Sequence, residues 1–388
     1  MLIKKMKLTW AGVASLTLFT GVAHAQSSVT LYGIFDEGLN ITSNANGHSA
    51  WQMKSGDVYG ARWGLKGTED LGGGNKAIFR LQSGFDTNNG QMGQGSRLFG
   101  RQAYVGLSSD QYGTITFGRQ YDTSVDDLGF GGLTAAGNFG GDVNAHPFDN
   151  DNTDLDFRVN NAVKYVSPTY RGLTGEAMYS FSNEPRGFAN NRVWGTTLNY
   201  QNGGLTMAAS YLKLNNPGSN PTGAVTNDAL FVGSSQQDIG VATTYRFTHS
   251  LLGLAYSHVD VYEPTFNAYF TSQAGPAGGT WNSWKFDNFE VNDQYFFRPD
   301  LWLGAAYTFT IAHLHATTGT YVPKWHQVGL TLNYDLSKST SFYVQGTYQH
   351  VVSAHTGTEF DFAQNPAAAG ISTSQNQMVY RVAMIHRF

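Results

Sequence analysis

Apolar and polar residues alternate along most of this chain, which is the pattern of strands whose two faces meet different surroundings. In the segment 58–67, for example, Trp63 and Leu65 fall on one face, and Arg62 and Lys66 fall on the other. Sixteen segments with this alternation are predicted as strands: 28–36, 58–67, 75–86, 98–108, 112–120, 159–167, 173–182, 192–201, 205–214, 237–247, 251–262, 284–297, 301–312, 324–335, 341–351 and 376–388.

The connections between these segments alternate in length. Several are short turns, namely 70–74, 171–172, 202–204, 248–250 and 335–339, and several are long loops, namely 40–56, 215–236, 263–282 and 353–375. Short turns at one end and long loops at the other are typical of outer-membrane barrels, whereas a soluble β-sandwich lacks this asymmetry. Aromatic residues also recur near the strand ends, as in the girdles at membrane surfaces. We therefore expect an all-β fold, a 16-stranded antiparallel transmembrane β-barrel.

One long segment, 118–158, interrupts the alternation. It is rich in glycine and contains eight aspartates, together with Phe130, Phe139 and Phe148. A disordered linker would tend to lack such aromatic residues, and a connection of this length inside a compact domain is usually functional. We predict that this third long loop, about 121–157, is ordered and folds inward into the barrel.

Composition excludes several kinds of site. The chain has 388 residues and no cysteine, which removes disulfides, thiol catalysis and thiolate metal sites. Its formal net charge is −4, so it does not have the basic character of a nucleic-acid-binding protein. After the N-terminus, no apolar run reaches the roughly 18 residues that a membrane-spanning helix requires.

The N-terminus has the features of an export signal. Lys4, Lys5 and Lys7 precede a mostly apolar stretch, 8–22, and the small residues of 23–25 follow. This order is that of a secretory signal peptide, although a short buried helix is an alternative. We predict a signal peptide at 1–25 and a mature barrel domain at 26–388.

Several motifs resemble those of the trimeric general porins of Gram-negative bacteria, in particular the β-proteobacterial branch. They are SSVTLYGIFDEGLN, YGARWGLKGTEDLGGG, RQAYVGLSSDQYGTITFGRQYD, FGGD and the terminal Phe388. The resemblance implies three barrels per assembly, each a separate water-filled pore in the outer membrane that is narrowed halfway by the third long loop. It also implies that Phe388 is the signal read by the outer-membrane assembly machinery, and that the partners are membrane lipid, small hydrophilic solutes and ions.

The resemblance further implies a constriction in which arginines on the wall face carboxylates on the loop. The matching arginines are Arg62, Arg101 and Arg158. The alternation of the strands independently adds Lys66, Arg80 and Lys164, which fall on the polar faces. Arg101 instead shares its parity with apolar residues, so its assignment rests on the resemblance alone.

The loop departs from the family's pattern, because this chain has Asn138 where enterobacterial relatives place an acid before FGGD. The candidates near that motif are Asp122, Asp126, Asp127 and Asp142. We expect Asp142 either to face the pore or to hold the loop by hydrogen bonds. A second acidic run is expected to be solvated; it comprises Asp149, Asp151, Asp154 and Asp156. Because the assigned bases of the constriction outnumber the acids assigned to the pore, we expect a weak anion preference.

No nucleophile motif and no metal-binding motif is present, so neither an enzyme nor a cofactor is predicted. His313 and His315 share one strand face and are interpreted as a polar pair rather than a metal site. His146 is either a titrating group near the constriction, active near pH 6–7, or an exposed loop histidine. The predicted function is a diffusion channel for small hydrophilic solutes and ions. The alternatives are a receptor or adhesin that acts through its surface loops, and a substrate-specific channel.

Overall fold

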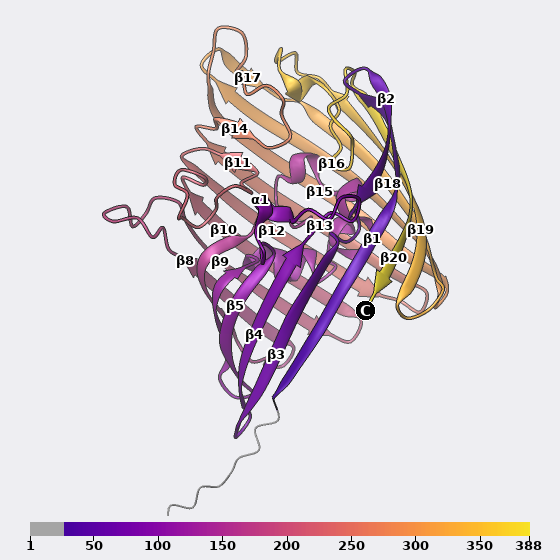
Figure 1. The fold of residues 1–388 in the computed structure, drawn as a ribbon. Helices are drawn as coiled ribbons and strands as arrows, with labels where there is room; N and C mark the ends of the chain where they lie inside the picture. The colour runs from indigo at the N-terminus through magenta and orange to yellow at the C-terminus, as the bar shows by residue number, and fades with distance from the viewer. Residues whose placement is uncertain (1–26) are drawn as a thin grey trace, which may run out of the picture.

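The computed structural model describes residues 27–388 as a closed antiparallel barrel of sixteen strands (Figure 1). The barrel strands are β1 (Ser28–Ala45), β3 (Arg62–Gly72), β4 (Asn75–Gly84), β5 (Gln102–Ser109), β6 (Gly113–Gln120), β7 (Val159–Val166), β8 (Leu173–Ser180), β9 (Arg192–Asn202), β10 (Leu205–Asn215), β12 (Ser235–Arg246), β13 (Ser250–Tyr262), β15 (Trp281–Arg298), β16 (Leu301–Ala316), β18 (Lys324–Asp335), β19 (Thr340–Val352) and β20 (Asn376–Arg387). The predicted fold class is confirmed. The predicted signal peptide, 1–25, lies outside the described residues.

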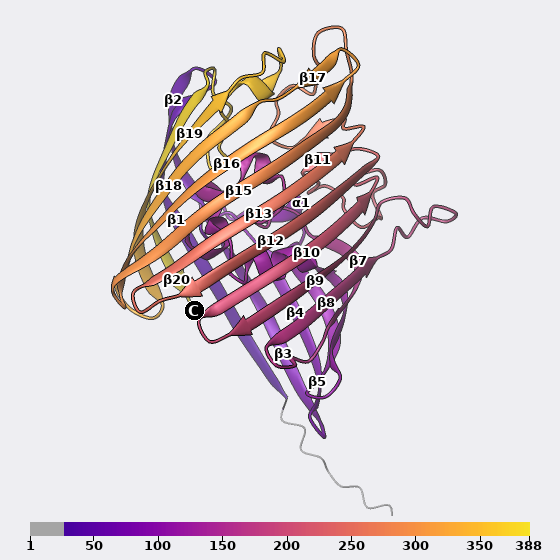
Figure 2. The same cartoon turned by 180° about the vertical axis from the view of Figure 1, so that it is seen from behind.

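The ring closes where the last strand pairs with the first. β20 is antiparallel to β1 from Ile34↔Arg387 to Thr42↔Val379, and the yellow and indigo strands lie side by side in Figure 1. Every other barrel strand pairs with its neighbours in chain order, as the view from behind shows (Figure 2). A closed sheet leaves no unpaired strand edge, which is the requirement for a sheet in contact with lipid.

Shorter elements extend the sheet or lie in the loops. They are β2 (His48–Ser55), β17 (Gly319–Tyr321), a separate pair formed by β11 (Phe231–Val232) and β14 (Phe266–Asn267), α1 (Gly93–Ser96) and η5 (Glu359–Asp361). No helix within residues 27–388 is long and apolar enough to cross a membrane.

The segment 40–56, predicted as a long loop, is instead a β-hairpin. β1 continues to Ala45 and pairs with β2, so that Ile41 lies opposite Trp51. Asn46 and Gly47 both have positive φ, at 54° and 90°, as the two central residues of a type I′ hairpin turn do. The Asn-Gly pair was therefore the signal in the sequence that marked this hairpin.

The two faces of the barrel wall differ as the alternation predicts. The outward face exposes large apolar side chains such as Leu254, Val291 and Leu330, whereas the inward face carries buried polar ones such as Gln327 and Thr331. This apolar-out, polar-in arrangement is that of a barrel with a hydrated interior.

The loop 121–157 folds inside the barrel, as predicted (Figure 1). It is not structureless, because it contains four helical turns: η1 (Val125–Gly129), η2 (Ala136–Gly140), η3 (Gly141–Asn144) and η4 (Pro147–Asp149). Phe148 at its far end enters a buried aromatic cluster, with ring centroids 5.7 Å from Trp325 and 5.7 Å from Phe360. Because Phe360 belongs to the loop 353–375, this cluster joins the inward loop to an outer loop.

A buried ion pair lies at the seam between the first and last strands. Arg381 on β20 contacts Asp36 on β1 at 2.8 Å, and both side chains are fully buried. Tyr343 donates a hydrogen bond to Asp36 at 2.6 Å, and Arg381 also donates to Asn40 at 2.6 Å. Since buried charges are tolerated only when they are paired and hydrogen-bonded, this network fixes the seam.

We expect Arg381→Gln to destabilise the folded barrel by about 3–5 kcal/mol, because it leaves the Asp36 carboxylate buried without a counter-charge. The temperature at which the detergent-purified protein loses its folded form on an unheated gel measures the effect. Arg298→Gln is the matched control, since its pair with Asp300 is solvent-exposed and is worth about 0–1 kcal/mol. Equal unfolding temperatures for the two variants would contradict this assignment.

Candidate functional site

The inward loop and the barrel wall enclose a narrow cavity of about 210 Å³. Its charged lining residues are Lys54, Asp57, Arg62, Arg101, Asp142, Asp154, Asp156 and Arg158. They come from the end of β2, the connection 56–61, the start of β3, the residues directly before β5 and β7 (Val159–Val166), and the loop itself. Bases and acids distant in the sequence therefore meet at one level of the barrel.

Three arginines on the wall side of this cavity are held over the rings of two neighbouring tyrosines. The guanidinium carbons of Arg158 and Arg101 lie 5.1 Å and 5.9 Å from the ring centroid of Tyr121, and Arg158 also donates a hydrogen bond to the Tyr121 hydroxyl at 3.2 Å. Arg62 lies over the neighbouring ring of Tyr59, at 6.0 Å. Cation–π contacts of this kind hold like charges in place without neutralising them.

Arg101 is part of this group although strand parity had placed it on the apolar face. β5 begins at Gln102, so Arg101 precedes the strand and its side chain does not follow the strand's alternation. Its amide still donates to the carbonyl of Gln82 at 3.1 Å. The resemblance, and not the alternation, identified its position.

Lys66 and Arg80, predicted for the constriction, lie below the narrow cavity. Their ammonium and guanidinium groups are held over the ring of Tyr32, at 5.5 Å and 5.7 Å. Lys66 follows Arg62 by four residues on the same strand, which places it about 13 Å further toward the short turns at about 3.3 Å per residue. The alternation that suggested both residues contains no information about depth along the barrel. Neither residue lines the narrow cavity.

The tip of the loop is attached to the wall by the FGGD motif. Lys54 donates to the carboxylate of Asp142 at 2.6 Å and lies 3.6 Å from Asp57. The amide of Asp142 donates to the carbonyl of Asp57 at 3.2 Å. Gly141 has φ of +56°, and a Cβ there would overlap that same carbonyl, so only glycine permits this approach. Asp142 therefore both faces the cavity and holds the loop.

Further glycines on the inner wall make room for the loop. A Cβ on Gly240 would overlap Leu128, a Cβ on Gly304 would overlap Phe139, and a Cβ on Gly329 would overlap Asn144. The three glycines belong to β12, β16 and β18, so the loop lies against a series of strands that lack side chains at the points of contact. The loop could not occupy this position against a wall of larger residues.

The other predicted loop carboxylates have different surroundings. Asp122 is fully buried and accepts hydrogen bonds from the amides of Ser124 and Val125 at 2.8 Å and 3.0 Å. Burial raises its pKa to about 6. Asp127 accepts a hydrogen bond from Asn199 at 2.9 Å. Neither lines the narrow cavity, so these two residues anchor the start of the loop.

Asp126 pairs with Lys164 at the lower side of the loop. Both line a wider cavity of about 640 Å³ that also includes Arg80. This cavity shares Arg62 and Phe130 with the narrow one, so the two are adjacent. The predicted bases and acids are thus divided between a narrow level and a wider vestibule below it.

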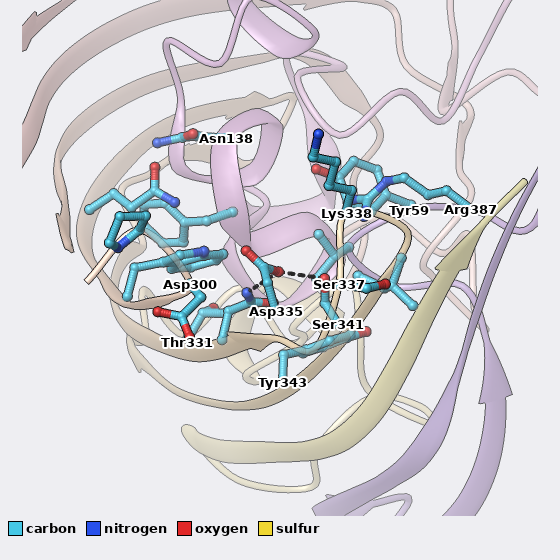
Figure 3. Close-up of a pocket in the computed structure, with 17 residues that line it drawn as sticks. Tyr59, Asn138, Asp300, Thr331, Asp335, Ser337, Lys338, Ser341, Tyr343 and Arg387 are labelled. Atoms are coloured by element: carbon cyan, nitrogen blue, oxygen red, sulfur yellow. Dashed lines mark hydrogen bonds between the residues drawn. The ribbon is translucent and has the colours of Figure 1, made fainter. Parts of the chain in front are cut away.

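A second part of this vestibule, of about 500 Å³, lies under η2 and beside the turns of β16 and β18 (Figure 3). Asp335 lines one side of this space and accepts a hydrogen bond from Ser341 at 2.6 Å. Lys338 and Arg387 lie on the opposite side (Figure 3). Tyr59 and Val58 line both this space and the narrow cavity.

On the loop side, Asp156 lines both the narrow cavity and a space of about 420 Å³ beneath the long loops. The narrow cavity is therefore flanked by larger spaces toward both ends of the barrel. It is the smallest of these four neighbouring spaces.

Sequence reasoning missed Lys54, Asp57 and two acids of the run expected to be solvated, Asp154 and Asp156, all of which line the narrow cavity. Lys54 and Asp57 were overlooked because their segment was taken for an outer loop. Among the described residues, no group of three or more His, Asp or Glu side chains is arranged to hold a metal ion.

The chain matches the family model of the Gram-negative porins over residues 12–353. The chain belongs to the Gram-negative porins. This porin is 35% identical to an outer membrane porin protein of Bordetella pertussis, over 88% of this chain and 94% of that protein. It is 27% identical to outer membrane porin protein 32 of Delftia acidovorans, over 95% of this chain and 96% of that protein.

Among solved structures, the porin resembles the anion-selective porin from Comamonas acidovorans with a TM-score of 0.70 at 20% identity, covering 94% of this chain and 100% of that one. This likeness shows a common fold. Membership of the family establishes an outer-membrane barrel that acts as a diffusion channel.

We expect Gly329→Val to displace the loop from the wall and to widen the porin's pore, because a side chain at this position overlaps Asn144. Single-channel conductance in a planar bilayer should rise while the heat-resistant folded barrel is retained. Gly346→Val is the matched control, since its nearest neighbour is an outward Tyr380 ring atom at 3.4 Å. An unchanged conductance for Gly329→Val would show that the loop does not limit flow.

Proposed function

We propose that the narrow cavity is the constriction of a diffusion channel for small hydrophilic solutes and ions, with a weak preference for anions. The observation that carries the proposal is the group of Arg62, Arg101 and Arg158 on one wall, opposite carboxylates on the inward loop. No carboxylate of residues 27–388 lies within ion-pair distance of these three arginines.

The charges on the loop side are partly neutralised. Lys54 pairs with Asp142 and approaches Asp57. Burial and the neighbouring carboxylates raise the pKa of Asp154 well above its usual range, so this carboxyl is uncharged near neutral pH. Three arginines then face the charges of Asp57 and Asp156. The arginines therefore outweigh the remaining acids at the narrowest level. This balance favours anions modestly rather than strongly.

A narrow aqueous path through a low-dielectric wall concentrates the field of the charges that line it. Opposed rows of positive and negative charge then direct anions and cations along different sides of the path. Charges in the wider vestibules matter less, because salt screens them beyond about 8 Å. Ionic preference should therefore depend on the constriction residues much more than on the overall charge of the chain.

The relatives support two parts of this proposal. The Comamonas acidovorans structure is described as an anion-selective porin, and a Vibrio cholerae OmpT structure with a TM-score of 0.65 is described as a trimer form. We infer a homotrimer here as well. Phe388, whose amide and carbonyl both bond to Gly33, is proposed as the residue that the outer-membrane assembly machinery reads.

Arg62→Ala should shift the zero-current potential in a salt gradient toward cations, because it removes one of three uncompensated positive charges. The measurement is the reversal potential of single trimers in a planar bilayer under a tenfold gradient of about 0.1 to 1 M salt. Arg246→Ala, at the short-turn end of β12, is the control and should leave the potential unchanged. A cation-selective unmodified channel would contradict the proposed anion preference.

Raising the pH should also weaken anion preference. Burial raises the pKa of Tyr121, but the positive charges of Arg101, Arg158 and Arg62 outweigh burial and lower that pKa to about 8. Between pH 7 and about pH 9.5 the phenolate forms and neutralises part of the arginine charge. The reversal potential should move toward cations over this range, and Tyr121→Phe should abolish that part of the change. An identical pH profile in the variant would refute the role of Tyr121.

A further inference from the structure

His146 lies in the middle of the inward loop, buried between two carboxylates. Its Nδ1 atom is 2.7 Å from Asp151 on the loop, and its Nε2 atom is 3.2 Å from Glu290 on β15. The side chain is almost fully buried, with 1% of the residue's surface exposed. The histidine is therefore neither an exposed loop residue nor part of the constriction surface.

Both carboxylates also accept hydrogen bonds from other donors. Glu290 accepts from the amide of Ala135 at 2.8 Å and from Asn292 at 2.7 Å. Asp151 accepts from Thr153 at 3.1 Å and from Ser257 on β13. A carboxylate that accepts several hydrogen bonds is stabilised in its ionised form. Each ring nitrogen of His146 then faces an acceptor, and only a doubly protonated imidazole can donate from both nitrogens.

The surroundings of His146 are otherwise acidic. Asp149 on the loop is buried close by, and burial raises its pKa well above the usual range, so that it carries no charge near neutral pH. Asp238 on β12, near Asp151, is also buried. Among the described residues, no lysine or arginine forms an ion pair with Asp151 or Glu290. A protonated His146 is thus the cation that compensates Asp151 and Glu290, and buried charges of one sign need such compensation.

We propose that His146 is a positioning residue, a buried imidazolium that clamps the constriction loop to β15 and thereby keeps the pore narrow. This inference rests on the proposed function, since it assigns the loop's position to the clamp. The flanking segment agrees with it, because Gln327 on β18 donates to the carbonyl of Ala145 at 2.9 Å and Phe148 enters the aromatic cluster. Of His146, the Gln327–Ala145 hydrogen bond and the Phe148 packing, only the His146 contact changes with pH.

The clamp should release on the alkaline side of neutrality. Burial alone would lower the pKa of His146, but Asp151 and Glu290 outweigh burial and raise that pKa well above its usual range. A base whose pKa is raised on folding stabilises the docked loop fully below its unfolded-state pKa of about 6.5. That stabilisation is lost as the pH rises through the folded-state pKa. The response near pH 6–7 considered from the sequence is therefore not expected.

Three measurements on the full-length purified protein test the clamp. Nitrogen NMR of histidine-labelled protein should show both ring nitrogens of His146 protonated at pH 7. Amide hydrogen exchange of residues 143–152 in His146→Gln should be about tenfold faster than in the unmodified protein at the same pH, the factor that corresponds to a change of one pKa unit in the interaction. Single-channel conductance should rise at alkaline pH in the unmodified channel, and His146→Gln should show the raised value already at pH 7.

Two further variants separate the clamp from other effects. His355→Gln, at an exposed loop histidine, is the matched control and should behave like the unmodified protein. Glu290→Gln keeps the contact with Asp151 but removes one negative charge, so the alkaline transition should move to lower pH. All these variants are also made in a Tyr121→Phe background, which removes the pH effect of the Tyr121 phenol expected in the constriction.

A singly protonated, neutral His146 ring at pH 7, or unchanged exchange and conductance in His146→Gln, would overturn the clamp. These outcomes are distinct from failure of the proposed function. If the arginine variants leave ion preference unchanged, the constriction proposal fails, while NMR and amide exchange still decide the state of His146.

Discussion

The position of the inward loop depends on one continuous polar network that begins at the seam of the barrel. The buried pair of Arg381 and Asp36 extends through Asn40 to Asp57, and from there through Lys54 to Asp142 on the loop. Buried charges are costly unless each finds its partner. The same contacts that close the first strand on the last therefore fix where the loop lies, and barrel closure and pore geometry are linked.

Other contacts hold the loop at points away from this polar network. At the opposite end of the loop, Phe148 packs into aromatic residues on the inner wall, while Gly240, Gly304 and Gly329 provide contact points without side chains. Polar contacts define the loop's position near the arginines, and apolar packing fills the remaining lumen. Because the loop is held at both ends, its charges keep fixed positions along the ion path. In a mobile loop, the positions of these charges would be averaged.

The alternation of residues predicted the sixteen strands and their faces, because a period of two is imposed by the pleat itself. It could not predict depth, as Lys66 shows, and it did not apply to Arg101, which precedes its strand. The surroundings of His146, Asp154 and Asp156 depend on segments more than a hundred residues away or on the fold of the loop. Such tertiary contacts leave no local pattern. The hairpin at 40–56 was different, since its Asn-Gly turn was visible in the sequence.

The central claim is that the channel is narrowest between the loop and the arginine wall. The chain has no cysteine, so one introduced thiol can be modified alone with a bulky uncharged maleimide. Modification of Arg62→Cys should abolish most of the single-channel current, whereas modification of Lys338→Cys, which removes the same charge in the wider vestibule, should leave most of it. Equal losses at the two positions, or no loss at position 62, would contradict the account.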